Sequence, residues 1–431
     1  MDSERLGMEK SPQNTTLNDP ERLLRICLLS YRSDPHCGGQ GVYVRNLSQA
    51  LCDLGHRVDV VSGPPYPVLD NGVKLHRLPS LDLYNPQDLF RTPSLRELCD
   101  PVNLLEWIGV STMGFPEPLT FGIRAHRWLA SANGRYDIVH DNQSLSYGIR
   151  ALARQRPLVA TIHHAITVDR DLAVRAERSL WKKAKQRRWY SFIQMQKRVA
   201  PALRRIITVS DCARQDIQRE FGIPEKRFSI VPNGIDTGLF HPCPEIERRP
   251  ERLIVTTSAD TPLKGLKYLL RAVAELAPSR PRLQLTVVGT PKKKSPVLKL
   301  INQLGIARRV RFTGRIDHQE FVRQYARAWV AVVPSLYEGF GLPAGEAMAC
   351  GVPVISTTGG ALPEVVGDTG LLVPPADHRA LAQAIALLCD HPHKARTLGE
   401  AGYKRVMHHF TWQNAAQKTV IAYRQAIDDY R

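Results

Sequence analysis

Short apolar runs alternate with amphipathic segments along most of the chain. Strands are predicted at Arg25 to Ser30, Leu158 to Ile162, Leu253 to Thr257 and Trp329 to Val333, among others, and helices follow the loops behind them. Continuous apolar runs are typical of strands buried on both faces, so this order predicts parallel sheets covered by helices. The alternation stops at a proline-containing, charged segment and then restarts. We therefore predict an α/β protein with two Rossmann-like, doubly wound domains that face each other across a cleft.

The interruption divides the 431 residues into four parts. They are a disordered lead (1–22), an N-terminal domain (23–240), a C-terminal domain (241–410) and a last helix that crosses back to the N-terminal domain (411–431). The lead is polar and lacks the apolar core of a signal peptide. The proline-rich region from Leu81 to Pro118 is expected to be irregular, and its apolar side chains form either a small separate core or an acceptor-binding surface.

The stretch from Val330 to Ala376 combines an apolar strand, a glycine-containing loop and the start of a helix. Glu338 and Gly339 lie in the loop, and Pro343 suits the first helical turn because its missing N–H has no partner there anyway. Helix N-termini attract anions, above all at the carboxyl edge of a parallel sheet. The stretch therefore predicts an anion site, and a second carboxylate, Glu346, follows on the helix.

The N-terminal domain opens with a strand and the glycine-rich loop Gly38 to Gly41. This loop lacks the G-x-G-x-x-G pattern, and Ser62 stands where a ribose-binding acid would end the second strand. A nicotinamide-dependent oxidoreductase is therefore disfavoured, whereas a loop that approaches another ligand closely remains open.

The net charge of +18 indicates an anionic partner. Basic residues concentrate between Arg170 and Arg205, where twelve Lys or Arg stand against two acids. On a helix, four apolar side chains would share one face there: Trp181, Trp189, Phe192 and Ile193. A solvated helix whose aromatics pack on its own domain and attachment to an anionic membrane surface both remain open. No RNA-binding or zinc-finger signature is present, so we expect no nucleic-acid partner.

Two further observations concern the compartment. No apolar run approaches the roughly 18 to 20 residues that span a bilayer. The eight cysteines are scattered and form no C-x-x-C pair, which favours a reducing environment. We expect a cytoplasmic protein that binds peripherally at the inner face of the membrane.

Taken in order, the motifs resemble those of the GT-B glycosyltransferases of family 4, which are retaining enzymes that use sugar nucleotides. The strongest is E-x7-E, which stands as Glu338 to Glu346 in EGFGLPAGE, and VSDCA, VPNGID, VVG, FTGR, GVPVIST and a closing FTW support it. The resemblance covers nearly all of residues 24–425. It implies hexose transfer from a nucleotide-diphosphate sugar, most often UDP- or GDP-linked, to an acceptor hydroxyl. The basic and apolar segments favour a glycan or lipid-linked acceptor at a membrane surface.

The resemblance also implies that three side chains take part in the transfer. His163 contacts the sugar near its reactive carbon, Lys264 neutralises the donor diphosphate, and Glu338 holds the hexose. Gly38 and Gly39 are expected to bring backbone N–H groups to the diphosphate. Preorganised donors aimed at a leaving group that gains negative charge account for much of the catalysis in such a site. No protein nucleophile is then needed, since the departing phosphate oxygen helps to take the acceptor proton.

Other residues are implied in donor binding alone. Glu346 is expected to accept hydrogen bonds from the ribose hydroxyls, and Arg315 and Ile316 to lie beside the base. The backbone amides that hold the hexose and the terminal phosphate are those of Gly339, Phe340, Gly341 and Leu342. Asp169-Arg170-Asp171 matches a metal-binding D-x-D pattern only superficially. We expect neither a metal nor a cofactor.

The sequence departs from the family at one position. An Arg usually stands six residues before the lysine, where this chain has Ser258. One cation would then face the diphosphate, unless Arg32, Arg315 or the run Lys292 to Lys294 supplies another. An active enzyme is expected, with a catalytically weak or binding-only homologue, or a nucleic-acid-binding α/β protein, as the alternatives.

Overall fold

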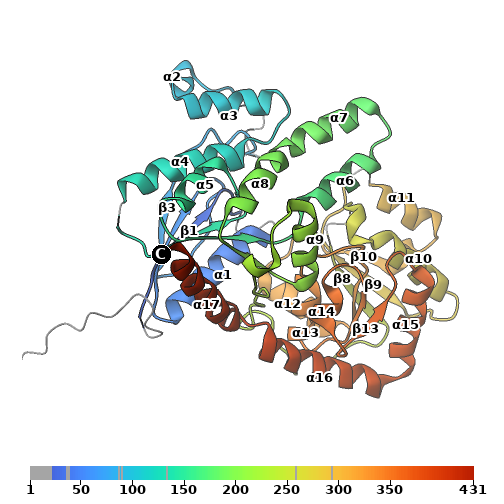
Figure 1. The fold of residues 1–431 in the computed structure, drawn as a ribbon. Coiled ribbons are helices and arrows are strands. Elements are labelled where there is room, and N and C mark those ends of the chain that lie inside the picture. The colour runs from blue at the N-terminus through green and yellow to red at the C-terminus, as the bar shows by residue number, and fades with distance from the viewer. Residues whose placement is uncertain are drawn as a thin grey trace, which may run out of the picture.

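The structure is a computed structural model that describes residues 22–34, 39–85, 88, 91–132, 134–257, 260–292 and 295–431. The expected disordered lead up to residue 21, Gly38 and Ser258 lie outside the described residues. Two parallel sheets organise the rest, each covered by helices on both faces (Figure 1). This arrangement confirms the predicted fold class of two doubly wound domains.

The N-terminal domain is built on a seven-stranded sheet with the order β3-β2-β1-β4-β5-β6-β7. All neighbouring strands are parallel. The chain changes direction across the sheet between β1 and β4, and such a switch point opens a crevice at the carboxyl ends of the strands. The strands are β1 (Arg25–Ser30), β2 (Arg57–Ser62), β3 (Lys74–Arg77), β4 (Ile138–Asn142), β5 (Leu158–Ile162), β6 (Arg205–Thr208) and β7 (Phe228–Ile230).

The C-terminal domain repeats this plan with six parallel strands in the order β10-β9-β8-β11-β12-β13. Its switch point lies between β8 and β11. The strands are β8 (Arg252–Thr256), β9 (Gln284–Val288), β10 (Val310–Phe312), β11 (Val330–Val333), β12 (Val354–Thr357) and β13 (Leu371–Val373).

The helices fall into the same two groups. Those of the N-terminal domain are α1 (Gly39–Asp53), α2 (Leu95–Leu98), α3 (Pro101–Ser111), α4 (Glu117–Ser131), α5 (Tyr147–Ala153), α6 (Ile166–Ala176), α7 (Leu180–Trp189), α8 (Ile193–Val199) and α9 (Asp211–Phe221). Those that follow are α10 (Leu266–Leu276), α11 (Pro296–Gln303), α12 (His318–Arg327), α13 (Leu342–Ala349), α14 (Leu362–Val366), α15 (His378–Asp390), α16 (Pro392–His409) and α17 (Trp412–Tyr430).

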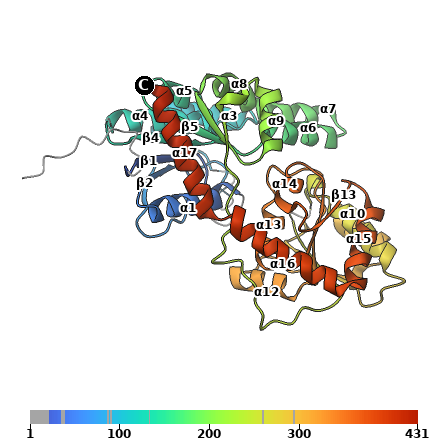
Figure 2. The same cartoon turned by 60° about the horizontal axis from the view of Figure 1, so that its bottom comes forward.

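The last helix ties the two domains together. Figure 2 shows α16 lying along the C-terminal domain and α17 continuing from it onto the N-terminal domain. Tyr423 of α17 is fully buried there, with its hydroxyl 2.7 Å from Nδ1 of His140 on β4. Buried side chains of α17 share a core with those of α1 and β1. The chain therefore crosses between the domains twice, at residues 231–251 and again at Phe410 to Thr411.

The prediction that Leu81 to Pro118 is irregular is wrong, because this region contains α2, α3 and the start of α4. Asp100 caps α3 by accepting a hydrogen bond from the backbone N–H of Val102. Glu106 of α3 forms a 2.6 Å ion pair with Arg124 of α4, and both side chains are almost completely buried. Capping and this ion pair favour a helix where proline content suggested a loop.

The prediction of one apolar face on a continuous helix is also wrong. A 3₁₀ turn (Tyr190–Phe192) separates α7 from α8 and changes the direction in which the side chains point. Trp189 stacks on Phe115 at 5.1 Å between ring centroids, and Ile193 is fully buried. Trp181, by contrast, is 67% exposed. Most of these aromatics therefore pack on their own domain, while the start of α7 faces solvent.

In the described part of the chain, no helix combines the length and the apolar character that crossing a membrane requires.

Candidate functional site

A cavity of about 340 Å³ lies between the two domains. The start of α1 and the loops that follow β4 and β5 line it on one side, and the loops that follow β8 and β11 line it on the other, so each sheet contributes its switch point. This is where ligands bind in open parallel sheets. Eight of the predicted site residues line the cavity: Gly39, His163, Lys264, Glu338, Gly339, Phe340, Gly341 and Leu342.

The central polar contact of the cavity joins the loops after β8 and β11. Nζ of Lys264 lies 2.8 Å from Oε1 and 3.1 Å from Oε2 of Glu338. Ser335 donates a hydrogen bond of 2.7 Å to the same Oε1. Gly265 lets the loops meet, since a Cβ there would lie 1.8 Å from the carbonyl oxygen of Pro334. A cation and a carboxylate are thus held together at the cavity wall, where an anionic ligand would compete with Glu338 for Lys264.

The loop between Glu338 and α13 brings the domains into contact. A Cβ on Gly339 would lie 2.9 Å from the carbonyl oxygen of His163, so only glycine fits this approach. Ser210, at the start of α9, donates a 2.8 Å hydrogen bond to the Gly339 carbonyl. Gly341 has φ +105° and precedes α13, which confirms the predicted turn into a helix with Pro343 in its first turn. The partly positive N-terminus of α13 therefore lies at the cavity.

His163 follows β5 and lies on the N-terminal side of the cavity. Its Nε2 is 2.8 Å from Oδ1 of Asn142, and its ring packs edge-on against Tyr43 with centroids 4.6 Å apart. Because the amide oxygen only accepts, Nε2 carries the proton and Nδ1 keeps a lone pair. Burial lowers the pKa of His163 to about 3, and the neighbouring His164 lowers it further. The imidazole is therefore neutral at physiological pH.

Glu346 lies on α13, which follows the loop that contains Glu338, and it does not line the cavity. Burial raises the pKa of its carboxyl to about 7, although a 3.4 Å hydrogen bond from the Tyr325 hydroxyl favours ionisation. Its charge therefore changes close to neutral pH.

Two predicted residues, Arg315 and Ile316, lie in the loop after β10 and do not line the cavity either. Arg315 is exposed. Of the other cations proposed to compensate for Ser258, Arg32 is already engaged by Glu117 at 3.0 Å. Lys293 and Lys294 lie outside the described residues. Lys264 is thus the only lysine or arginine among the described residues of the cavity wall.

Sequence reasoning assigned no role to several polar residues that the structure brings to the site. Gln143 lines the cavity, and its side-chain oxygen accepts a 2.9 Å hydrogen bond from the His163 backbone. Asn233 and Trp412 line the same cavity, and in the described structure Oδ1 of Asn233 and Nε1 of Trp412 are buried without a hydrogen-bond partner. Asn233 belongs to VPNGID and Trp412 to FTW, two motifs that were used only as markers of the family.

Both carboxylates of Asp169-Arg170-Asp171 are engaged by neighbouring side chains. Asp169 lies 2.6 Å from Nε2 of His164, and Asp171 pairs with Arg170 at 2.7 Å. Over the described ranges, no group of three or more His, Cys, Asp or Glu side chains is arranged to hold a metal ion.

Comparisons with known proteins cover nearly the whole chain. The profile of the family described as "Glycosyl transferases group 1" matches residues 244–405, and that of "Glycosyltransferase Family 4" matches residues 37–239. An MMP alpha-(1->4)-mannosyltransferase from Mycolicibacterium hassiacum is 47% identical over 94% of this chain and 98% of its own. A D-inositol 3-phosphate glycosyltransferase from Catenulispora acidiphila is 30% identical over 94% and 96%.

Solved structures agree on the fold. Sucrose-phosphate synthase from Thermosynechococcus elongatus has a TM-score of 0.70 at 26% identity, over 93% of this chain and 98% of its own. The Anabaena protein HepE, solved with UDP-glucose, has a TM-score of 0.64 at 17% identity, over 92% and 98%. Both likenesses extend over the two domains.

Proposed function

The chain belongs to the group 1 glycosyltransferases of family 4 and has their GT-B fold, and on that premise we propose that it transfers mannose from a nucleoside diphosphate donor to a glycan 4-hydroxyl. The proposal rests on one observation above all, the 47% identity with an alpha-(1->4)-mannosyltransferase over almost the full length of both chains. UDP- or GDP-linked mannose is the expected donor. No metal or cofactor is required.

The donor diphosphate lies between Lys264 and the N-terminus of α13. Lys264 leaves Glu338 for the phosphate oxygens, and Glu338 then accepts hydrogen bonds from the hexose hydroxyls. Backbone N–H groups from Gly39 and from the loop 339–342 complete the anion site, which the cavity lining supports. Because Glu346, Arg315 and Ile316 do not line the cavity, the nucleoside extends beyond it, where Glu346 accepts hydrogen bonds from the ribose and Arg315 and Ile316 contact the base.

The sugar is transferred with retention at its anomeric carbon. The bond between that carbon and the diphosphate oxygen breaks, the departing oxygen takes the proton of the acceptor hydroxyl, and the acceptor oxygen bonds to the carbon from the same face. Neutral His163 contacts the sugar from the opposite wall of the cavity, where its burial keeps a second positive charge away from the reactive carbon. Stabilising the negative charge on the leaving group is the main catalytic contribution.

The acceptor is a glycan presented at a membrane surface, such as a lipid-linked one. Leu104, Leu105 and Ile108 of α3 are between 39% and 48% exposed, while Leu180 and Trp181 at the start of α7 are 83% and 67% exposed. The hydroxyl of Thr112, directly after α3, accepts a 2.7 Å hydrogen bond from Arg188 of α7, so the two helices are neighbours. Exposed apolar side chains beside a basic helix favour an anionic interface.

The transfer is tested by incubating the full-length protein with UDP- and GDP-mannose and with short mannosides that carry a free 4-hydroxyl. A new α-(1→4) linkage, assigned by NMR, supports the proposal, and matching glucose donors measure the choice of sugar. Turnover of no nucleotide sugar would refute it. Co-sedimentation with vesicles tests the acceptor separately, because equal binding to neutral and anionic vesicles would refute a membrane-surface acceptor.

A further inference from the structure

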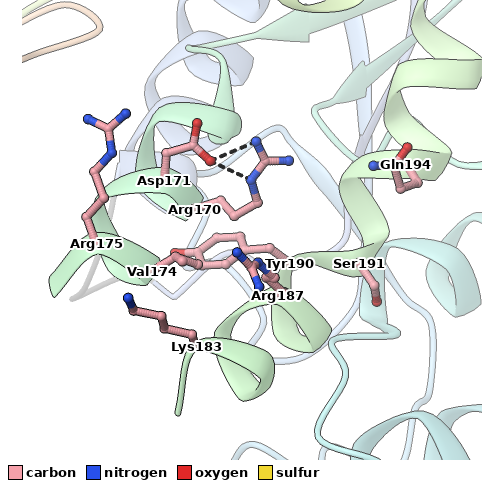
Figure 3. A pocket seen from close by; sticks show the side chains of 9 residues that line it. All are labelled: Arg170, Asp171, Val174, Arg175, Lys183, Arg187, Tyr190, Ser191 and Gln194. Atoms are coloured by element: carbon pink, nitrogen blue, oxygen red, sulfur yellow. Dashed lines mark hydrogen bonds and ion pairs between the residues drawn. The ribbon is translucent and has the colours of Figure 1, made fainter. Parts of the chain in front are cut away.

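A second cavity, of about 710 Å³, lies between α6 and α7, outside the cavity already described. Its lining is strongly basic, with Arg170, Arg175, Lys183 and Arg187 against a single acid, Asp171. Figure 3 shows Arg175 and Lys183 at one end of this α6–α7 cavity and Ser191 and Gln194 at the other. Residues from α6, α7, the 3₁₀ turn and α8 thus line a space that is open to solvent and large enough for a ligand.

The charges in this cavity are largely uncompensated. Asp171 is already bound to Arg170 at 2.7 Å, the contact drawn in Figure 3. In the described structure, Arg175, Lys183 and Arg187 make no ion pair and no side-chain hydrogen bond. An anion that bound in this cavity would therefore meet several cations that no carboxylate in the described structure neutralises. The planar guanidinium groups of arginine bind phosphate oxygens through two parallel hydrogen bonds, which makes phosphate the best match.

Residues of α6 line both the α6–α7 cavity and the cavity between the domains, which is the donor cavity of the proposed function. Ile166 and Asp169, in the first turn of this helix, line the donor cavity, and the next two residues, Arg170 and Asp171, line the second one. One helical turn advances by about 5.4 Å, so the positions of α6 that line the two cavities lie within about two turns of each other. Both α6 and α7 belong to the N-terminal domain, which lies opposite the donor-binding loops.

We propose that the α6–α7 cavity is a binding site for a phosphate ester on the acceptor side of the enzyme. Arg175, Lys183 and Arg187 contact the phosphate oxygens, and Tyr190 forms part of the wall. The phosphate belongs either to a phospholipid headgroup beside Leu180 and Trp181 or to a soluble phosphorylated ligand. The inference rests on the proposed function only where it assigns this cavity to the acceptor side. Phosphate binding itself is measured without any donor.

The experiment compares two triple variants of the full-length protein. Arg175→Ala/Lys183→Ala/Arg187→Ala removes the cations of the cavity. Arg178→Ala/Lys182→Ala/Lys185→Ala removes the same charge from exposed positions of the same segment that do not line it. Circular dichroism and the melting temperature establish that both variants fold. Because neither set of side chains makes a hydrogen bond or an ion pair in the described structure, both variants are expected to melt like the parent protein.

Two probes distinguish the sources of the phosphate. Glycerol phosphate, followed by calorimetry with glycerol as the neutral control, represents a soluble ligand, and phosphatidylcholine vesicles with and without phosphatidylglycerol represent a membrane. We expect the cavity variant to bind at least one probe about tenfold more weakly than the control variant, since it loses several charge-assisted hydrogen bonds.

Loss confined to vesicles identifies a headgroup, and loss of glycerol phosphate identifies a soluble phosphate. Equal loss in both variants would mean that only the general positive field attracts anions, and the proposal would be wrong. Failure of the parent protein to bind either probe would also overturn it. If the protein shows no transferase activity but the cavity variant still loses phosphate binding, the proposed function is refuted and the phosphate site is not.

Discussion

Lys264 and Glu338 are bound to each other at the wall of the donor cavity, with Nζ 2.8 Å from Oε1. The two residues come from loops behind different strands, β8 and β11, and both are expected to contact the donor through different groups. Without a donor, the two side chains therefore bind each other. When the donor binds, Lys264 exchanges Glu338 for the phosphate oxygens, and Glu338 exchanges Lys264 for the hexose hydroxyls. This exchange makes the two side chains separable by experiment.

Glu338→Gln is expected to lower kcat/KM for transfer by about 10²-fold or more, because the negative charge is lost and an NH₂ donor replaces one of the two oxygens that accept from the hexose hydroxyls. It should not weaken binding of the nucleoside diphosphate alone, since Lys264 loses its competitor. Lys264→Ala is expected to lower kcat/KM for transfer and also to weaken binding of the nucleoside diphosphate. Lys267→Ala, an exposed lysine three residues further on, is the matched control. Calorimetry of the diphosphate separates the outcomes, and weaker binding in Glu338→Gln would argue against the exchange.

Glu346 is expected to make donor binding depend on pH. Its carboxyl, with a pKa raised to about 7 by burial, must ionise to accept two ribose hydrogen bonds. Donor affinity should therefore rise as the pH increases through 7. Glu346→Gln cannot titrate, so its affinity should be lower and flat over the same range. Equilibrium binding between pH 5.5 and 8.5, about the range that brackets this group, provides the measurement. A slope that persists in the variant would assign the dependence elsewhere.

The same group affects stability with the opposite sign. The folded state keeps the proton of Glu346 above the ordinary carboxyl pKa of 4.5, whereas the unfolded state releases it. The unfolded chain thus binds fewer protons between pH 4.5 and about 7, so this residue lowers the free energy of unfolding as the pH rises through that window. Denaturant unfolding of the parent protein and Glu346→Gln should show the difference growing up to about pH 7 and then remaining constant.

His163 is expected to stay neutral throughout the working range of the enzyme. Burial holds its pKa near 3, so its ring resonances should not titrate between pH 5 and 8. Asn142→Ala removes the 2.8 Å contact that fixes the tautomer, and should lower kcat more than donor affinity. An NMR titration curve for His163 with a midpoint near 6.5 would contradict this assignment.

The contact between Glu364 and α9 should hold the two domains in the arrangement that the structure shows, with the donor cavity between them. Glu364, on α14 of the C-terminal domain, accepts 2.8 Å hydrogen bonds from the backbone N–H groups of Asp211 and Cys212. A carboxylate at a helix N-terminus contributes about 0.3 to 1 kcal/mol when exposed. Glu364→Ala should therefore raise the donor KM a few-fold and increase the radius of gyration. Glu400→Ala, an exposed glutamate of the same domain, is the control; equal behaviour of both would mean that this contact has no such role.

The C-terminal half of the donor site was predictable from sequence because its residues are close together in the chain. Strand β11, the loop with Glu338 and helix α13 form one continuous unit, so strand, glycine and proline signals fix their order. Asn142 and Gln143 were missed, although Asn142 ends β4 and Gln143 follows it, which puts both at the same sheet edge as His163. Their role depends on the pairing of β4 with β5, which no local pattern reveals.

Elements held by tertiary contacts were the hardest to predict. Strand β3 is a polar edge strand with the sequence KLHR, and only its pairing with β2 makes it a strand. Helix α3 depends on the buried pair Glu106 and Arg124, which joins positions 18 residues apart. The break after α7 depends on Trp189 stacking against Phe115. In each case the deciding partner is distant in sequence, and a pattern of neighbours cannot show it.

The central claim is that the protein transfers mannose, with retention at the anomeric carbon, in the cavity between its two domains. Its most direct test is the anomeric configuration and position of the bond formed from a nucleoside diphosphate α-mannose and a mannoside acceptor, assigned by NMR for the parent protein and for Lys264→Ala. The account predicts an α-(1→4) product whose rate of formation falls by about 10²-fold or more in Lys264→Ala. A β-linked product, or an α product formed equally fast by the variant, would contradict it.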